Sequence, residues 1–161
     1  MSTAALEEEI SRLKWEKEFI QNWLADLLDT MGTLLDREIC VRMIEGCGQG
    51  CFRRFSFKQD LARQGQGSLE KLLAAYRQNF EVWQDGDQVH IRYGETSPGC
   101  YCPAARFRPA NADDLHCECA RRTHQTIFET ALGRPFQAEV VESLRRGGKT
   151  CHFVVHLDQG C

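Results

Sequence analysis

Two pairs of cysteines, each pair separated by one residue, are the part of this sequence best suited to chemistry. Residues 99–103 read GCYCP, and residues 117–119 read CEC. Side chains alternate faces along an extended segment, so Cys100 and Cys102 would point the same way there, with their Cα atoms roughly 6 to 7 Å apart. Such thiols could form a disulfide, supply half of a metal site, act as a reactive centre or fill the core.

The remaining cysteines enlarge this set. The chain of 161 residues holds nine cysteines, and an odd number cannot close entirely into disulfides within one chain. In a reducing compartment, cysteines are more often ligands or reactive groups than crosslinks. Cys47 and Cys51 lie among glycines, and Cys151 lies in the last predicted strand. We expect Cys40, in an apolar helical stretch, to fill the core and Cys161 to be an unstructured terminal thiol.

A shared metal site is the chemistry that the two CxC pairs favour. Tetrahedral zinc needs four ligands, with Zn–S distances of about 2.3 Å. Cys117 and Cys119 would lie about 200° apart within a helix, so both can serve one site only if Cys117 precedes the helix. Thiols at a helix N-terminus have lowered pKa values, and Arg121 and Arg122 add positive potential nearby. Four thiolates suit zinc or an iron–sulfur cluster. The predicted ligands are Cys100, Cys102, Cys117, Cys119 and Cys151.

Four further residues could contribute to such a site. Cys47 and Cys51 are additional candidate ligands. His116 either completes a Cys₃His site or is an exposed polar residue before a helix. His124, farther along the same predicted helix, is a candidate general base.

Helical periodicity dominates the first 80 residues. Residues 1–31 place apolar side chains at three- and four-residue steps, which predicts an amphipathic helix with Ser2 or Thr3 as its N-cap. Residues 32–80 form a second helical part. Its first helix runs towards Gly46, where the glycines of GCGQGC are expected to interrupt it. Its second helix starts from a Ser cap at Ser68.

Beyond residue 80 the period becomes that of strands. EVWQDGDQVHIRYG predicts a hairpin around DGD. Residues 100–107 read as a short strand, and residues from about 114 to 132 as a helix ended by Gly133 and Pro135. FQAEVVESL and KTCHFVVHL follow as two strands joined by RRGG. Residues 81–158 therefore form a sheet plus one helix.

Length and composition limit the number of domains that the chain can form and exclude some functions. The chain is 42% hydrophobic, enough for one core, so residues 1–161 are expected to form a single α+β domain. We expect N-terminal helices packed on an antiparallel sheet of four to five strands, with one helix inserted between strands. The net charge of −3 provides no positive field for nucleic acid. No apolar run is long enough to cross a membrane, and no leader is recognisable, so a cytoplasmic protein is expected.

The C-terminal half resembles a known family. The matching features are Cys117 leading an amphipathic helix, Gly133 at its end, Glu142 in the next strand, and Gly147 in a turn before Cys151 and Phe153. They resemble the 4-vinyl reductase domain, a small ligand-binding α+β module of bacteria and archaea, and its L-2-amino-thiazoline-4-carboxylic acid hydrolase-like relatives. The pattern covers about 40 residues and extends to roughly 120 if the upstream helices also correspond.

The resemblance implies a zinc site of cysteines plus an acidic residue, beside a pocket for a small apolar molecule in a bacterial protein. Cys117 and Cys151 fit this pattern, and Glu142 is the candidate acid. The family has a middle cysteine eight residues before the last one, where this chain has Ser143. Another thiol, from Cys119, Cys100 or Cys102, would have to replace it.

Three functions follow as hypotheses. The first is a small-molecule-binding or sensor domain with a cysteine-rich metal site, zinc ahead of an iron–sulfur cluster, whose N-terminal helix is available for contacts in a homodimer. The second is a cysteine-dependent hydrolase acting on a small C–N bonded substrate, with His124 or Glu142 as proton acceptor. The third is a thiol redox switch that uses Cys47 and Cys51.

Overall fold

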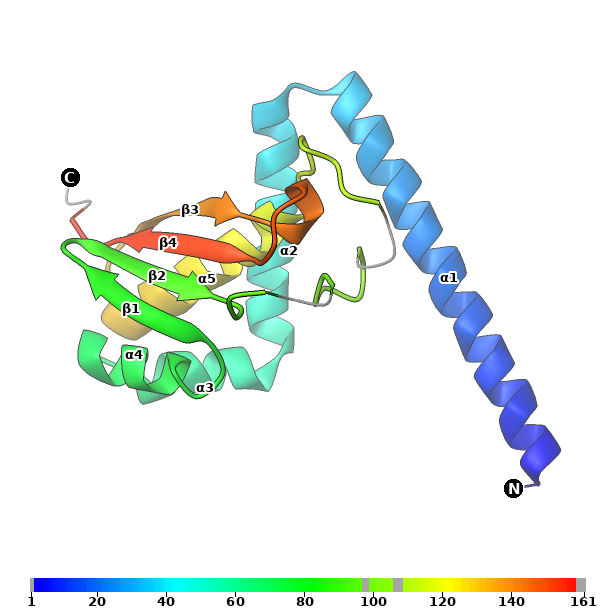
Figure 1. Cartoon of the computed structure of the whole chain (residues 1–161), viewed down its shortest axis with the longest axis horizontal. Coiled ribbons are helices and arrows are strands. Elements are labelled where there is room, and N and C mark those ends of the chain that lie inside the picture. Colours follow the sequence, from blue (N-terminus) through cyan, green and yellow to red (C-terminus); the bar gives the residue numbers. More distant parts are fainter. Residues whose placement is uncertain (1, 97–98, 106–108, 159–161) are drawn as a thin grey trace.

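Helices and one antiparallel sheet make up the part of the chain that the computed structural model describes, residues 2–96, 99–105 and 109–158 (Figure 1). The elements in order are α1 (Thr3–Leu34), α2 (Arg37–Arg54), α3 (Ser56–Gln64), α4 (Leu69–Tyr76), β1 (Glu81–Asp85), β2 (Gln88–Arg92), α5 (Cys117–Leu132), β3 (Gln137–Glu142) and β4 (His152–His156). The predicted α+β class is confirmed.

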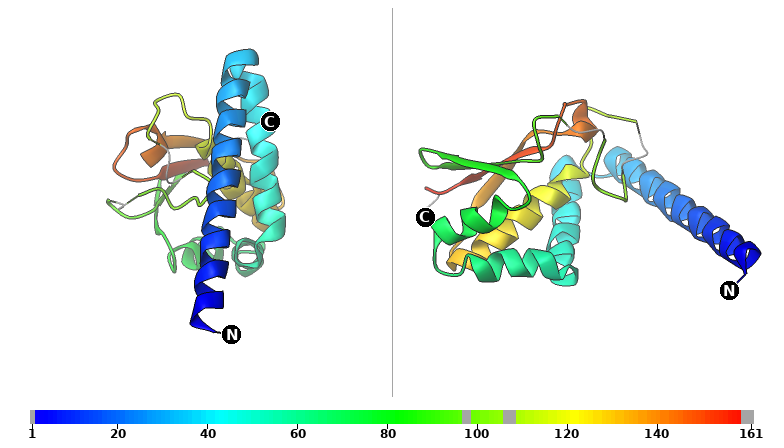
Figure 2. Two further views of the ribbon diagram at one scale, coloured as in Figure 1. Left: turned by 90° about the vertical axis from the view of Figure 1, so that its right-hand side faces the viewer. Right: turned by 60° about the horizontal axis from the view of Figure 1, so that its bottom comes forward.

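The sheet has the strand order β1-β2-β4-β3, and every neighbouring pair is antiparallel. The hairpin predicted around DGD is confirmed as β1 and β2, with Val82 opposite Ile91. Helices α4 and α5 cover one face of the sheet (Figure 2). The core between these layers includes Tyr76, Phe128 and Val155, which are completely buried. This layer fixes the position of α5, whose first turn carries two of the predicted site residues.

Helix α1 begins at the predicted N-cap, and most of its length projects from the rest of the domain. Ser2 is its N-cap, and the Ser2 side chain accepts a hydrogen bond from the Ala5 backbone N–H at 3.3 Å. The helix extends away from the sheet and the other helices (Figures 1 and 2). Met31 is the buried residue of α1, and it packs with Cys40 and Ile44 of α2. The remainder of the helix is therefore held to the domain mainly through its C-terminal end.

Helix α2 corrects the prediction that the glycines around Cys47 interrupt the helix. It continues through them to Arg54. The reason is a close crossing with α5: a Cβ atom on Gly48 would lie 2.5 Å from the Cys119 carbonyl oxygen and 2.9 Å from the Arg122 Cβ. Glycine weakens a helix locally by about 1 kcal/mol, but here its missing side chain lets two helices approach.

Other boundaries also differ from prediction. Helix α3 was not expected, while α4 begins after the predicted cap, Ser68, whose side chain accepts from the Lys71 N–H at 3.3 Å. The strand predicted for residues 100–107 is wrong over 100–105, which form turns and irregular backbone. Its last two residues lie outside the described part of the chain, as does Cys161.

Two of the predicted site residues lie at element boundaries. Helix α5 begins at Cys117 rather than near residue 114, because the Asp114 carboxylate accepts the His116 backbone N–H at 2.7 Å in a turn that precedes the helix. Cys151 lies just before β4 rather than within it. Both thiols therefore sit where an element begins.

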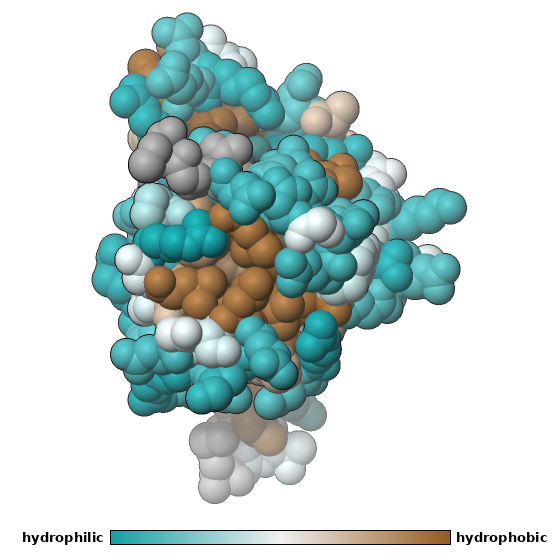
Figure 3. All heavy atoms as spheres, turned by 90° about the vertical axis from the view of Figure 1, so that its left-hand side faces the viewer, coloured by the Kyte–Doolittle hydropathy of each residue, from teal (hydrophilic) through white to brown (hydrophobic). Residues whose placement is uncertain are grey.

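One face of the molecule carries a group of apolar side chains. Figure 3 shows them in the middle of the end that faces left in Figure 1, within a hydrophilic rim. Among the described residues, no helix is long and apolar enough to cross a membrane.

Candidate functional site at the start of helix α5

Thiols from four segments of the chain gather around the first turn of α5. They are Cys51 of α2, Cys102 of the 99–105 segment, Cys117 and Cys119 of α5, and Cys151 before β4. All of them are free thiols. Segments far apart in sequence therefore bring these thiols near one another, mainly in pairs.

The first pair is Cys51 with Cys119, whose Sγ atoms are 3.9 Å apart. A disulfide requires about 2.05 Å, whereas two thiolates on one tetrahedral zinc ion, with Zn–S bonds of about 2.3 Å, lie about 3.8 Å apart. Burial raises the pKa of Cys119, and the nearby thiols of Cys51, Cys102 and Cys47 act in the same direction. Cys119 is therefore protonated at neutral pH unless a cation replaces its proton.

The second pair is Cys102 with His116. Their Sγ and Nε2 atoms are 2.9 Å apart, and the Asp114 turn described above places the histidine. Burial raises the pKa of Cys102, and the thiols of Cys51 and Cys117 contribute in the same direction. Cys102 therefore lies within electrostatic range of the first pair and connects it to the third.

The third pair is Cys117 with Cys151, at the starts of α5 and β4. The neighbouring Cys117 thiol lowers the pKa of Cys151, and Cys151 raises the pKa of Cys117, so Cys151 is the first of the two to ionise. The hydroxyl of Ser143 lies 2.8 Å from the Cys117 Sγ. Ser143 thus stands beside this pair, where the family pattern places a third thiol.

Cys100 lies at the edge of the cluster. Burial raises its pKa, and the thiols of Cys102 and Cys117 act in the same direction. Cys47 is exposed on α2. Cys40 does not join the cluster: it is completely buried, with its Sγ 3.3 Å from the Met31 carbonyl oxygen. Its prediction as a core residue is confirmed.

The two candidate proton acceptors have other partners. The Tyr76 hydroxyl lies 3.1 Å from Nδ1 of His124, and the Tyr93 hydroxyl lies 2.9 Å from its Nε2. Burial lowers the pKa of His124 to about 3, so this histidine is neutral at physiological pH. The Glu142 carboxylate accepts the backbone N–H groups of Lys149 and Thr150 at 2.6 and 3.3 Å, which fixes the turn before Cys151.

Ion pairs hold the segment that carries the site. Arg145 donates to the Asp114 carboxylate at 2.7 Å, and both side chains are buried. Glu118, at the start of α5, accepts from Arg121 at 2.6 Å and from Arg146 at 2.7 Å. These contacts fix the start of α5 against the turn after β3, which brings Cys117 next to Cys151.

Metal-binding geometry is incomplete in this arrangement. Thiolate and imidazole donors suit zinc, and the Cys51–Cys119 separation fits one edge of its tetrahedron. Within residues 2–96, 99–105 and 109–158, however, no three His, Cys, Asp or Glu side chains form a group that could hold a metal ion. The donors therefore fit the metal by type and, for one pair, by spacing.

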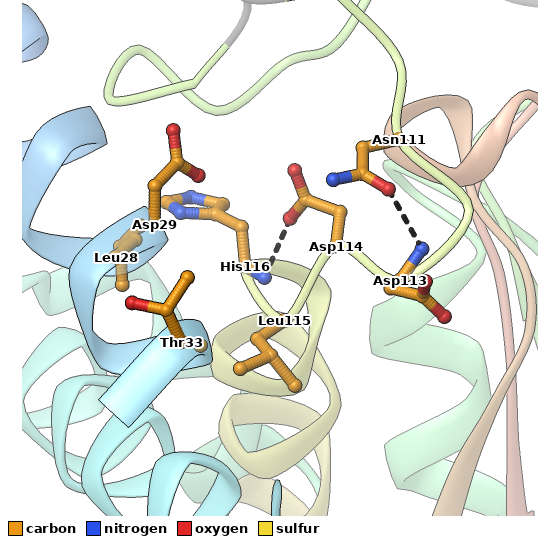
Figure 4. Close-up of a pocket in the computed structure, with 9 residues that line it drawn as sticks. Leu28, Asp29, Thr33, Asn111, Asp113, Asp114, Leu115 and His116 are labelled. Atoms are coloured by element: carbon orange, nitrogen blue, oxygen red, sulfur yellow. Dashed lines mark hydrogen bonds between the residues drawn. The ribbon is translucent and has the colours of Figure 1, made fainter. Parts of the chain in front are cut away.

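Two pockets lie next to these residues. The larger, about 340 Å³, is lined by Leu28, Asp29, Gly32, Thr33, Asn111, Asp113, Asp114, Leu115 and His116. It lies between the end of α1 and the turn before α5, with mostly polar side chains around it (Figure 4). The smaller, about 70 Å³, lies among Phe57, Leu61, Phe80, Tyr93 and His124 and is mainly apolar. The larger volume is within the range usual for ligand sites.

Sequence reasoning missed three features of the site. It placed Cys51 outside the first choice of ligands, although its four-residue spacing from Cys47 fits a helix face. It treated Ser143 as a missing ligand rather than a residue in contact with Cys117. Nothing local in the sequence pointed to the Tyr76 and Tyr93 contacts with His124.

A scan of the chain against protein-family models gives no match, and a search of curated proteins gives none either. The resemblance to the 4-vinyl reductase domain therefore stays a prediction.

Proposed function

We propose that this chain is a small-molecule-binding or sensor domain in which a cysteine-rich site holds a metal ion, with zinc as the first candidate. The observation that carries the proposal is the 3.9 Å separation of the Cys51 and Cys119 sulfurs. The two cysteines are 68 residues apart in sequence and lie in different helices. The spacing is that of two thiolates on one zinc ion and not that of a disulfide.

The donors proposed for zinc are Cys51, Cys102, Cys119 and His116, which would have to draw together around the ion, since they form no such group as the described residues stand. Cys102 contacts His116 and lies near Cys51, whose thiol contributes to its raised pKa. Bound zinc would supply a crosslink between α2, the 99–105 segment and α5. Because burial raises the pKa of Cys102 and Cys119, metal binding would release protons from both thiols.

A sensor role is supported by the position of the larger pocket. His116 lines that pocket and also contacts Cys102, so a small molecule there would touch a proposed metal donor. The apolar ligand expected from the resemblance suits the smaller pocket beside Tyr93 and His124 better, because its lining is mainly apolar. We propose a protein of bacterial type, from the resemblance, and a reducing, cytoplasmic compartment, because the eight described cysteines are all free thiols.

Metal content of the anaerobically purified chain tests the proposal. We expect about one zinc per chain for the wild type and for Cys40→Ala, because Cys40 lies outside the cluster. Cys51→Ser and Cys119→Ser should each lower the affinity at least tenfold, as loss of one of four ligands removes a full metal–ligand bond. A chelator competition gives the affinities, and circular dichroism confirms that the variants fold.

Two results would contradict the proposal. One is metal below a tenth of an equivalent in the wild type after growth and purification with zinc. The other is equal zinc affinity in Cys40→Ala and the two Ser variants. If the purified chain is brown and contains iron and sulfide, the site holds an iron–sulfur cluster and the choice of zinc is refuted.

A thiol redox switch is the second candidate, now supported at Cys117 and Cys151 rather than at Cys47 and Cys51. The Cys117 thiol lowers the pKa of the neighbouring Cys151, which makes Cys151 the nucleophile. A hydroperoxide would oxidise Cys151 to a sulfenic acid, which Cys117 would condense to a disulfide with loss of water. Peroxide treatment should lower the mass by 2 Da, and Cys151→Ser should abolish this change while keeping zinc.

The hydrolase hypothesis finds less support. Its two expected proton acceptors, His124 and Glu142, are engaged by tyrosine hydroxyls and by backbone N–H groups. Cys102 does contact an imidazole, that of His116, but the same atoms are donors in the metal proposal. Rapid alkylation of Cys102 at neutral pH in the presence of saturating zinc would favour the hydrolase, because a zinc-bound thiolate is protected.

A further inference from the structure

Helix α1 carries a regular heptad repeat of apolar residues. Alternating steps of four and three residues lead through Leu6, Ile10, Leu13, Lys17, Ile20, Leu24 and Leu27. This is the spacing of the a and d positions of a coiled coil, with Leu6, Leu13, Ile20 and Leu27 at d and the others at a. The repeat spans three consecutive heptads, and the flanking positions of the first two carry Glu7, Glu9, Lys14 and Glu16. This pattern is typical of a coiled coil.

The described part of the chain leaves most of this stripe uncovered. The exposed fractions are 46% for Leu6, 42% for Ile10, 50% for Leu13, 63% for Ile20 and 40% for Leu27. The N-terminal part of the helix runs away from the domain (Figure 2), while Gln21, beside the stripe, donates a hydrogen bond to the Pro103 carbonyl oxygen. Most of a helix's stability in a protein comes from packing its apolar face, so α1 requires a partner along this stripe.

We propose that α1 pairs with α1 of a second copy in a parallel, two-stranded coiled coil, which makes the chain a homodimer. Charge complementarity favours this partner and this direction. In a parallel pair, each g position faces the e position of the next heptad in the other helix. Glu9 of each copy then faces Lys14 of the other copy, which gives two ion pairs. Glu16 of each copy faces the uncharged Gln21 of the other. An antiparallel pair places Glu9 opposite Thr30 and Lys14 opposite Gln21, with no such ion pair.

The one polar residue in the stripe fits the same assembly. Lys17 occupies an a position, and a single lysine or asparagine there fixes register and a two-stranded state at a cost in stability. In register, the Lys17 stem covers the core while its ammonium reaches out of the seam beside Glu16 of the second copy. The seam ends near Met31, which packs into the domain instead.

The mass of the full chain in solution tests the dimer, measured under reducing conditions so that thiol crosslinks do not contribute. Light scattering and sedimentation between about 1 and 100 μM should give twice the monomer mass. Ile20→Glu should weaken the dimer at least about tenfold, because it buries a charge in the seam. Asn22→Glu, exposed on the opposite side of α1, should leave the mass unchanged.

Two further variants test the details. Lys17→Leu should tighten the dimer at least about tenfold, since it removes a polar residue from the core. Glu9→Lys and Lys14→Glu should each weaken it, and the double exchange should restore it, which only the parallel arrangement predicts. These results do not depend on the metal, so they stand apart from the proposed function.

Several results would overturn the proposal. One is that the wild-type chain is a monomer at about 100 μM and that Lys17→Leu does not convert it to a dimer. Another is that the chain is a dimer and remains one in Ile20→Glu. Binding of the monomeric chain to phosphatidylcholine or phosphatidylglycerol vesicles, abolished by Ile20→Glu, would assign the stripe to a membrane surface instead.

Discussion

At the scale of single residues, the site is organised by what lies between 2.8 and 3.9 Å from three of its sulfurs. Cys51 contacts another thiol, Cys102 an imidazole, and Cys117 a hydroxyl. Buried thiols without a cation keep their protons, as the raised pKa values of Cys102 and Cys119 indicate. The identity of each neighbour therefore decides whether a cysteine is suited to binding metal, to oxidation or to packing.

Ser143 offers a direct test of this view. Its hydroxyl lies 2.8 Å from the Cys117 sulfur, so Ser143→Cys would place a third sulfur beside Cys117 and Cys151. We expect bound zinc to rise from one towards two equivalents per chain, at a stability cost of about 1 kcal/mol for the altered hydrogen bond to the Arg145 N–H. Ser143→Ala is the control and should bind no extra zinc. An unchanged metal content in Ser143→Cys would contradict the proximity of these three side chains.

His124 should make stability depend on pH. Its pKa is about 3 in the folded chain and about 6.5 when unfolded, so between these values the unfolded chain binds a proton that the folded chain does not. The free energy of unfolding should therefore fall as pH decreases below about 6.5, by about 1 kcal/mol between pH 7 and 5.5. Urea denaturation measures this. The fall should shrink in His124→Gln but persist in the control His156→Gln, whose half-buried side chain lies 3.1 Å from the Glu139 carboxylate instead. An equal fall in both variants would contradict a buried, neutral His124.

At the scale of elements, the crossing of α2 and α5 determines the thiol contacts. Gly48→Ala would place a Cβ 2.5 Å from the Cys119 carbonyl oxygen. We expect a loss of about 1 to 3 kcal/mol in stability from overpacking, together with weaker zinc binding as Cys51 and Cys119 move apart. Chemical denaturation and chelator competition measure the two effects.

Gly46→Ala is the matched control for that change. A Cβ at Gly46 would meet nothing within 4 Å, so alanine should stabilise α2 by up to about 1 kcal/mol through helix propensity. Its zinc affinity should equal that of the wild type. If both variants had the same stability, the close crossing of α2 and α5 would be refuted.

How much the sequence predicts depends on whether the signal is local. The caps at Ser2 and Ser68 and the DGD hairpin were predicted, because each depends on a few neighbouring residues. The continuation of α2 through its glycines was not, because contact with α5 outweighs the local propensity. That the thiols share one metal site was inferred from their spacing and number and stays a prediction. Which sulfur meets which partner depends on that helix crossing and could not be read from the chain.

At the scale of the whole molecule, one sheet-and-helix core carries two separate features, the thiol cluster and the projecting helix α1. The thiol cluster joins α2, the 99–105 segment, α5 and the start of β4, and a metal held by Cys51, Cys102, Cys119 and His116 would crosslink α2, the 99–105 segment and α5. Helix α1 projects from the same region with its apolar stripe uncovered (Figure 1). The larger pocket lies where α1 meets the turn before α5. A ligand there would contact both the end of α1 and His116, a proposed metal donor.

Zinc K-edge X-ray absorption of the purified, zinc-loaded chain tests the central claim most directly. We predict a first shell of three sulfur atoms at about 2.3 Å and one nitrogen at about 2.0 Å, from Cys51, Cys102, Cys119 and His116. In Cys51→Ser the sulfur number should fall to two, while Cys40→Ala should keep three. A shell of oxygen and nitrogen alone, or a sulfur number that Cys51→Ser leaves unchanged, would contradict the convergence of these thiols on one ion.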